Sequence, residues 1–286
     1  MSTFKEGKST NRPTLKGCTF ISFILAILLG LSALLLENPV QAASIEFTDS
    51  IHDQLHKTAA AAGSTQKSII TKQYNDFSTL YKDTVSWDAK ISTIHYDNEA
   101  QVSAIRQQIR EINDEKITKL ETQVKELKNK YQPLFDSYSS LTRQVSAAKK
   151  LKDKTLYKVL SAQADVMKTA AALARQQIRT QQDALAAAKK EKTNLSKKIR
   201  GVLAEIDPVK NKMKAEKSVL SGQSKLISTE WTNFKAAIKK SDPDRASDSL
   251  ARLLTLSSKA HSLKQNIYNL EVNISGIIKR SKALIP

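Results

Sequence analysis

The chain has 286 residues and a formal net charge of +18 at pH 7, with 46 Lys and Arg against 28 Asp and Glu. It has one cysteine and seven glycines, which excludes an intrachain disulfide framework and leaves no glycine-rich loop that could hold a phosphate. Ala, Lys, Gln, Leu and Glu abound, strand signals are absent, and aromatic residues are only 6% of the chain. This composition favours long helices in a narrow bundle over a globule with a large core.

The N-terminus has the order of features that an export signal has. An uncharged, largely apolar run at 18–36 follows four basic residues, Lys5, Lys8, Arg12 and Lys16. The small residues Val40, Ala42 and Ala43 then provide a cleavage site, so we predict a signal peptide over 1–42 and a secreted or cell-surface product. Because the apolar run is close to the roughly 20 residues that span a bilayer, an uncleaved membrane anchor at 18–36 is the alternative.

Helical patterns follow the predicted signal. Residues 43–63 form a short amphipathic segment, and residues 64–240 form a long helical hairpin region. Apolar residues recur at spacings of three and four from Val102 to Ile112 and again from Ile117 to Leu134, which predicts two stripes that bury themselves against other helices. The five-residue skip between Ile112 and Ile117 predicts a local disturbance of the supercoil.

Breaks are predicted near residues 133, 150 and 208 of this region. Pro133 and Pro208 each either kink a helix or open a new one in its first turn. The lysine cluster at Lys149–Lys154 suits a hairpin tip, because so many charges fit poorly in a buried seam. A further apolar stripe runs from Leu195 to Met213 and crosses the position of Pro208.

Residues 241–286 predict a C-terminal helix that packs back on the bundle. Ser241 and Asp244 have the spacing of a capping box, and Pro243 occupies an early helical position. Apolar residues from Leu256 to Ile277 again alternate spacings of three and four. Several seams that each need a partner predict an all-α protein, an elongated antiparallel coiled-coil or helical bundle of long helices without a β-sheet.

No pattern predicts a catalytic, cofactor or metal site. His52 and His56 share a helix face, but no third histidine lies nearby, and two exposed histidines on a solvated helix explain the pair. Asp242, Asp244 and Asp248 lack the glycine and the terminal glutamate of a calcium loop. Paired carboxylates lie among lysines at helix-surface spacing, which is typical of solvated faces. The sequence therefore predicts a protein that is not an enzyme.

Positive charge is concentrated in one segment. Residues 147–240 have 22 basic and 8 acidic residues, whereas residues 44–146 have 13 and 14. This density predicts attraction to an anionic partner, and the excess of lysine over arginine favours diffuse attraction over recognition of defined groups. The predicted contact residues, which we call the basic flank, are Lys149, Lys150, Lys152, Lys154, Lys189, Lys190, Lys192, Lys197, Lys198, Arg200, Lys210, Lys212, Lys214, Lys217, Lys239 and Lys240.

An anionic cell-wall polymer or an anionic membrane surface is the partner that this charge favours. Specific nucleic-acid binding is not predicted, because the lysine clusters have few aromatic residues between them for base stacking. Other envelope proteins are further possible partners. Homo-oligomerisation is also open, because an exposed seam can be satisfied within one chain or between two.

These features predict an exported scaffold, tether or adaptor of the bacterial cell envelope. The alternative is an extracytoplasmic holdase, since the chain resembles exported helical-hairpin chaperones in charge and coiled-coil character. It is also similar to the coiled-coil regions of peptidoglycan hydrolases, which would imply a regulator of those enzymes. A helical toxin component is the weakest alternative, because the chain after residue 43 has no charge-free apolar run of about 18 residues.

Overall fold

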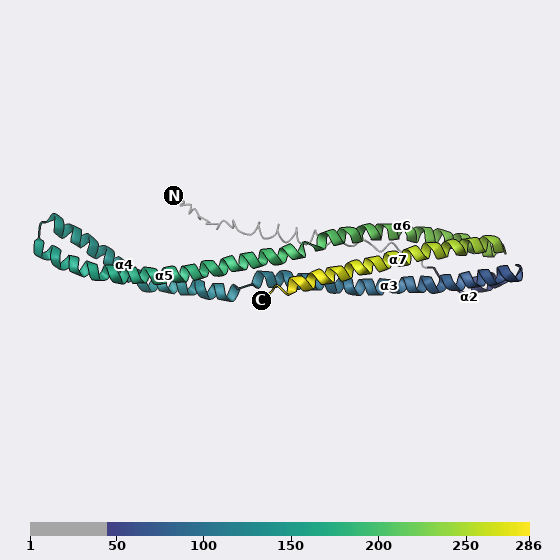
Figure 1. Ribbon diagram of the computed structural model, residues 1–286, viewed down its shortest axis with the longest axis horizontal. Helices are drawn as coiled ribbons and strands as arrows, with labels where there is room; N and C mark the ends of the chain where they lie inside the picture. The colour runs from purple at the N-terminus through teal and green to yellow at the C-terminus, as the bar shows by residue number, and fades with distance from the viewer. Residues whose placement is uncertain (1–44) are drawn as a thin grey trace, which may run out of the picture.

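The computed structural model describes residues 45–286, which fold into α-helices joined by short turns (Figure 1). The helices are α2 (Asp49–Ala60), α3 (Ser64–Glu111), α4 (Asp114–Lys150), α5 (Lys154–Leu203), α6 (Ile206–Lys239) and α7 (Pro243–Lys282). These residues contain no strand, so the predicted all-α helical bundle is confirmed for this part of the chain. The predicted anchor at 18–36 and the cleavage-site residues Val40, Ala42 and Ala43 lie outside the described residues.

The helices form a long rod with two parts (Figure 1). In one part α7 packs against both α3 and α6, and the short helix α2 lies against α3 and α6. In the other part α4 and α5 pair with each other as a hairpin. Helix α7 runs parallel to α3 and ends near the middle of the rod, so the hairpin extends beyond it as two helices.

Apolar and small side chains at alternate spacings of three and four join α4 to α5. On α4 the less exposed positions include Leu120, Val124, Leu127, Tyr131, Leu134, Tyr138, Leu141 and Val145. On α5 they include Leu160, Ala164, Met167, Ala171, Ala174, Ile178, Leu185 and Ala188. Several of the α5 positions are alanines, and side chains this small allow two helix backbones to approach each other closely.

Aromatic side chains make a core in the part of the rod formed by α3, α6 and α7, which we call the three-helix part. This core lies near the start of the short helix α2. The Phe47 ring lies with its centroid 5.7 Å from that of Phe77 and 5.4 Å from that of Trp231. Phe77 and Phe234 are fully buried. Because aromatic rings bury a large area each, a few of them supply much of the apolar burial in this part of the rod.

The rod has a joint where its two parts meet. There the helix breaks twice, once between α3 and α4 and once between α5 and α6. Between α3 and α4, Asn113 has φ 57° and lies in the left-handed region, which asparagine tolerates better than most residues. Between α5 and α6 the chain turns at 204–205. Ile112 and Ile206 belong to one buried cluster with residues of α7, so the joint is packed. The predicted disturbance between Ile112 and Ile117 is thus a full interruption of the helix.

One local prediction is wrong, and one of the two alternatives at Pro133 is excluded. Helix α4 continues through Pro133, so this proline does not open a new helix. Ser241 does not cap α7; it has φ 53°, and the Asp242 carboxylate accepts a hydrogen bond from the Arg245 backbone N–H at 3.1 Å instead. Pro208 lies in the first turn of α6, where a proline is tolerated because its missing N–H would have no intrahelical partner.

The interior position of Pro133 predicts a stabilising substitution. A proline inside a helix removes one backbone hydrogen bond and crowds the preceding turn, at a cost of about 3 kcal/mol. We expect Pro133→Ala to raise the free energy of unfolding by about 1–3 kcal/mol, measured by urea denaturation followed by circular dichroism. The control is Pro243→Ala in the first turn of α7, which should bring no such gain. Equal effects of the two substitutions would contradict this explanation.

Candidate functional site

The basic flank runs along the whole rod. Its residues lie at the hairpin tip and on α5 and α6, which follow one another from that tip to the opposite end of the rod (Figure 1). At 1.5 Å per residue, these two helices together span roughly 125 Å. The predicted contact residues therefore do not converge on one compact patch. They form a line of separate clusters.

Most of the basic flank is exposed and lacks a carboxylate partner. Lys189 pairs with Glu121 at 2.7 Å, Lys210 pairs with Glu99 at 2.6 Å, and the half-buried Lys192 pairs with the carboxylate at the start of α4. The remaining thirteen residues are exposed, and no carboxylate within 45–286 forms an ion pair with them. They are Lys149, Lys150, Lys152, Lys154, Lys190, Lys197, Lys198, Arg200, Lys212, Lys214, Lys217, Lys239 and Lys240.

The three paired lysines connect helices. Lys192 donates to the Arg110 carbonyl oxygen at 2.7 Å and also pairs with Asp114, so it links α5 to the end of α3 and the start of α4. Exposed ion pairs of this kind contribute only about 0–1 kcal/mol each. We conclude that three residues of the basic flank have structural partners, while thirteen are available to a ligand.

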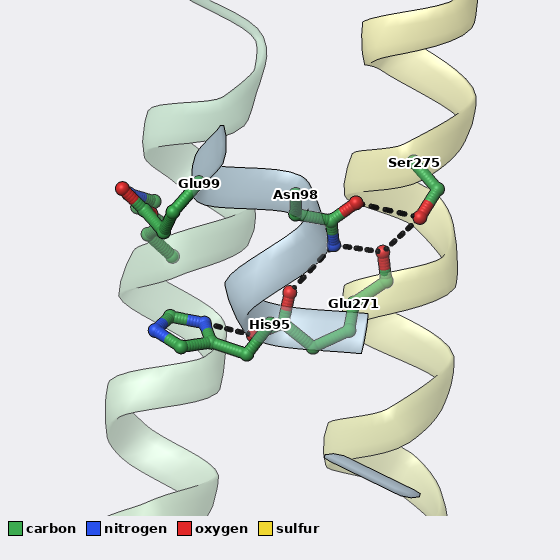
Figure 2. Close-up of polar contacts among 6 residues, drawn as sticks. His95, Asn98, Glu99, Glu271 and Ser275 are labelled. Atoms are coloured by element: carbon green, nitrogen blue, oxygen red, sulfur yellow. Dashed lines mark hydrogen bonds and ion pairs between the residues drawn. The ribbon is translucent and has the colours of Figure 1, made fainter. Parts of the chain in front are cut away.

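A buried polar cluster lies between α3 and α7 (Figure 2). Glu271 is only 1% exposed, and its carboxylate accepts a hydrogen bond from Asn98 Nδ2 at 2.8 Å and lies 2.7 Å from His95 Nδ1. The Ser275 hydroxyl donates to Asn98 Oδ1 at 2.7 Å. The carboxylate is therefore buried with partners on both of its oxygens, which is the condition under which a buried charge is tolerated.

Two further polar pairs lie on the same interface. Lys264 donates to Asp88 at 2.8 Å, and His261 Nδ1 lies 3.5 Å from Thr84 Oγ1. The partners in these pairs, like His95 and Glu271, are 176 or 177 residues apart in the sequence. This constant separation is what two parallel helices in one fixed register require, so the polar pairs specify the register of α3 against α7.

The sequence alone does not predict this cluster. Taken alone, His95 and His261 indicate no more than packing or surface positions, and Glu271 falls among apolar residues of α7 without a visible partner. The signal that could have revealed them is the repeated separation of polar residues between two segments. That signal has no meaning until α3 and α7 are known to run parallel.

The carboxyl of Glu271 titrates below its ordinary range. Burial by itself raises the pKa of this carboxyl. Hydrogen bonds from His95 and Asn98, together with the charges of His95 and Lys217, lower the pKa by more than burial raises it. Lys217 belongs to the basic flank, so one residue of the flank also acts on the interior. A cavity of about 50 Å³ adjoins Asn98 and Glu271. It has room for a water molecule and is far smaller than the pockets that hold small-molecule ligands.

The two histidines of α2 lie next to each other. The ring centroids of His52 and His56 are 4.4 Å apart. Within residues 45–286 no set of three or more His, Cys, Asp or Glu side chains is arranged to hold a metal ion. The pair therefore lacks the third protein ligand that a typical zinc site has.

Comparisons of the chain with protein-family models, with curated proteins and with solved structures find no match. Among the helices of residues 45–286, none combines the length and the hydropathy needed to cross a bilayer. The candidate site is therefore defined by this chain's own geometry, with the basic flank on the outside and the polar cluster inside.

The buried cluster predicts that the Glu271 carboxylate contributes strongly to the stability of the fold. Glu271→Ala removes the carboxylate that accepts from Asn98 and pairs with His95, so Asn98 Nδ2 keeps only its bond to the backbone carbonyl oxygen of residue 271. We expect the free energy of unfolding to fall by about 2 kcal/mol, measured by urea denaturation. The matched control is Glu126→Ala on the exposed surface of α4, which should change it by no more than about 0.5 kcal/mol. Similar losses in both variants would contradict the role of the cluster.

The same group predicts an acid-sensitive step in stability. Because the pKa of Glu271 is lowered in the folded protein, the unfolded chain binds this proton more tightly. The ionised carboxylate thus stabilises the fold above its unfolded pKa, near 4.5, and this contribution is lost as the pH falls through the lower folded value. We expect the melting temperature to fall in that window, and to fall less in Glu271→Gln. An identical pH profile in the two proteins would refute this assignment.

Proposed function

We propose that this protein is an exported, non-enzymatic coiled-coil rod of the bacterial cell envelope, and that its basic flank binds an anionic envelope polymer. In this role it tethers or scaffolds other envelope components. One observation carries the proposal above the others: thirteen exposed basic residues without a carboxylate partner in residues 45–286 lie along roughly 125 Å of rod.

A linear arrangement of charge favours a linear ligand. A small anion can contact only one of the clusters, whereas a polymer with repeated negative charges can contact several of them at once. Each further contact is then made within an existing complex, which strengthens binding without any new kind of interaction. Lysine also suits such a ligand, because a hydrated point charge does not demand defined geometry from its partner.

Both ends of the rod carry available lysines, which supports a tethering role. Lys152 and Lys154 lie at the hairpin tip, whereas Lys239 and Lys240 lie at the far end of α6. A rod that is adhesive at both ends can join two positions on a polymer network. The export features at 1–42 support an extracytoplasmic location, where such polymers occur.

The binding role is tested with a charge-matched pair of variants. The test variant replaces Lys197, Lys198, Lys212 and Lys214 by Gln, since these lysines are exposed and form no ion pair within 45–286. The control variant replaces four exposed lysines outside residues 147–240 by Gln, namely Lys57, Lys67, Lys259 and Lys279. Both variants lose the same net charge and keep the helix seams intact.

We expect the wild-type protein to bind inorganic polyphosphate and purified anionic cell-wall polymer, measured by sedimentation with the insoluble wall or by fluorescence anisotropy. The test variant should bind at least about tenfold more weakly than the control variant, given a contribution on the order of 1 kcal/mol per lysine at an anionic surface. Binding of the wild type should also fall as salt rises from 0.05 to 0.5 M, because added ions screen exposed charges. Equal affinities of the two variants would show that net charge alone, and not the basic flank, attracts the polymer.

Fractionation of cells separates the proposed attachment from its alternative. A high-salt wash should release the protein from the envelope if exposed charges hold it there. Retention in salt with release by detergent would indicate an anchor at 18–36 instead. Preference for anionic lipid vesicles over the wall polymer would identify the membrane surface as the partner.

A further inference from the structure

The outer surface of α5 has a second apolar stripe that nothing in residues 45–286 covers. Leu156, Val159, Val166 and Leu173 are 43%, 53%, 73% and 59% exposed. Val159, Val166 and Leu173 are spaced by seven residues, so they lie in one row along the helix. None of them belongs to the seam with α4, whose α5 members follow a different set of positions.

Charge is confined to another side of the same helix. Between 155 and 182, the charged residues of α5 are Lys158, Asp165, Lys168, Arg175 and Arg179. Their spacings of three, four and seven place them all in one sector of the helix. The helix thus has three sectors here: the seam with α4, the charged sector, and the exposed apolar stripe. A surface helix normally has an apolar side toward its core and a polar remainder, so the second apolar sector calls for a second partner.

The charged sector and the exposed apolar stripe of α5 lie on opposite sides of the α4–α5 pair, so each adjoins a different side of α4. On the charged side, Arg175 lies over the Phe135 ring, with 5.3 Å from Cζ to the ring centroid. On the stripe side, Gln177 accepts a hydrogen bond from the Tyr131 hydroxyl at 2.5 Å, and Gln181 donates to Gln123.

The α4 residues on the stripe side are uncharged over most of its length. Seven-residue steps from Gln123 reach Lys130, Ser137 and Gln144 on that side. The one lysine among them, Lys130, lies over the Tyr131 ring, with 5.4 Å from Nζ to the ring centroid. Together the two helices therefore present one broad face with an apolar row and small polar residues, which we call the hairpin face.

We propose that the hairpin face is the dimerisation surface of this protein, and that its occupant is the hairpin face of a second copy in antiparallel orientation. The row of Val159, Val166 and Leu173 is self-complementary in that orientation. A two-fold axis through Val166 places Val159 of one copy against Leu173 of the other, and the reverse, as a symmetric interface requires. The product is a four-helix bundle at the centre of a rod roughly 210 Å long, against roughly 125 Å for one chain.

The area of the face is sufficient for a specific dimer. From Leu156 to Gln177 the helix rises roughly 33 Å, and two packed helices are roughly 20 Å wide. Two such faces bury on the order of 1,300 Å² in total, which lies at the lower end of the range for specific interfaces. The dimer is therefore expected to dissociate at low concentration.

Charge at the hairpin tip selects the antiparallel orientation. In a parallel pair the two tips meet, and each tip brings the exposed residues Lys149, Lys150, Lys152 and Lys154. In the antiparallel pair each tip lies roughly 20 Å from the axis, so the two tips are separated by several Debye lengths at physiological salt.

The dimer is tested by sedimentation equilibrium of the full chain between about 1 and 100 µM. The wild type should show a monomer–dimer equilibrium within this concentration range, because the interface is at the lower end of the size range for specific complexes. Val166→Lys places two lysines against each other at the axis and should weaken dimerisation at least about tenfold. Val219→Lys, at another exposed valine, on α6 and outside the hairpin face, should leave dimerisation unchanged. A wild type that is monomeric throughout, or a Val166→Lys variant that dimerises normally, would overturn the proposal.

Single cysteines determine the orientation. Cys18 is the only cysteine of the chain, so Cys18→Ser provides a background without thiols. In that background Val166→Cys should form a disulfide-linked dimer, and a mixture of Val159→Cys and Leu173→Cys should form a mixed one. Leu173→Cys alone should not, because its two copies lie roughly 20 Å apart and a disulfide needs Cα atoms within about 7 Å. Efficient linkage of Leu173→Cys to itself would overturn the antiparallel arrangement. None of these measurements involves an anionic polymer, so they succeed or fail independently of the proposed function.

Discussion

Each long helix in residues 45–286 has an apolar stripe that it must bury, and this requirement sets the shape of the molecule. Side chains at alternate spacings of three and four can be buried only along another helix. Helix α5 therefore packs against α4 over most of its length, and α7 packs against both α3 and α6. Because the seams are narrow and partly made of alanine, no thick core forms, and apolar burial grows with length instead. A rod results, whose surface is large for its volume and leaves many lysines in water.

Polar side chains have different roles inside and outside this rod: those inside align helices, and those outside present charge to the solvent. Between α3 and α7, Glu271 is buried with partners on both oxygens, and its pairing fixes the alignment of two parallel helices. A slip of α7 along α3 would separate those partners from each other, so the cluster favours one register over its neighbours. On the outside, thirteen basic residues are exposed and have no carboxylate partner within residues 45–286. Lys217 acts in both settings, since it is exposed on α6 and still lowers the pKa of the buried Glu271 carboxyl.

Part of the basic flank lies on the same hairpin as the hairpin face, and the two surfaces serve different contacts. The tip lysines attract anions without defined geometry, whereas the row through Val166 requires a matching apolar surface. An antiparallel dimer would place one tip at each end of the shared bundle and leave the three-helix parts pointing away from each other. Such an assembly would carry available lysines over a length greater than that of one chain, which is an advantage for a protein that binds a polymer at several points.

The sequence by itself determined the fold class, the positions of most helices and the location of the excess charge, because these depend on local spacing and composition. The stripes from Ile117 to Leu134 and from Leu256 to Ile277 predicted helices that the structure contains. Local rules left two alternatives open at Pro133, and the structure excludes a new helix there, because α4 continues through this residue. At Asn113 they failed, since the skip in the stripe is a complete break between two helices. Only the tertiary structure decided which helices run parallel, and with that the partners of His95 and Glu271. It also decided which apolar residues of α5 stay outside, because a heptad pattern shows that a stripe needs a partner but does not identify the helix that covers it.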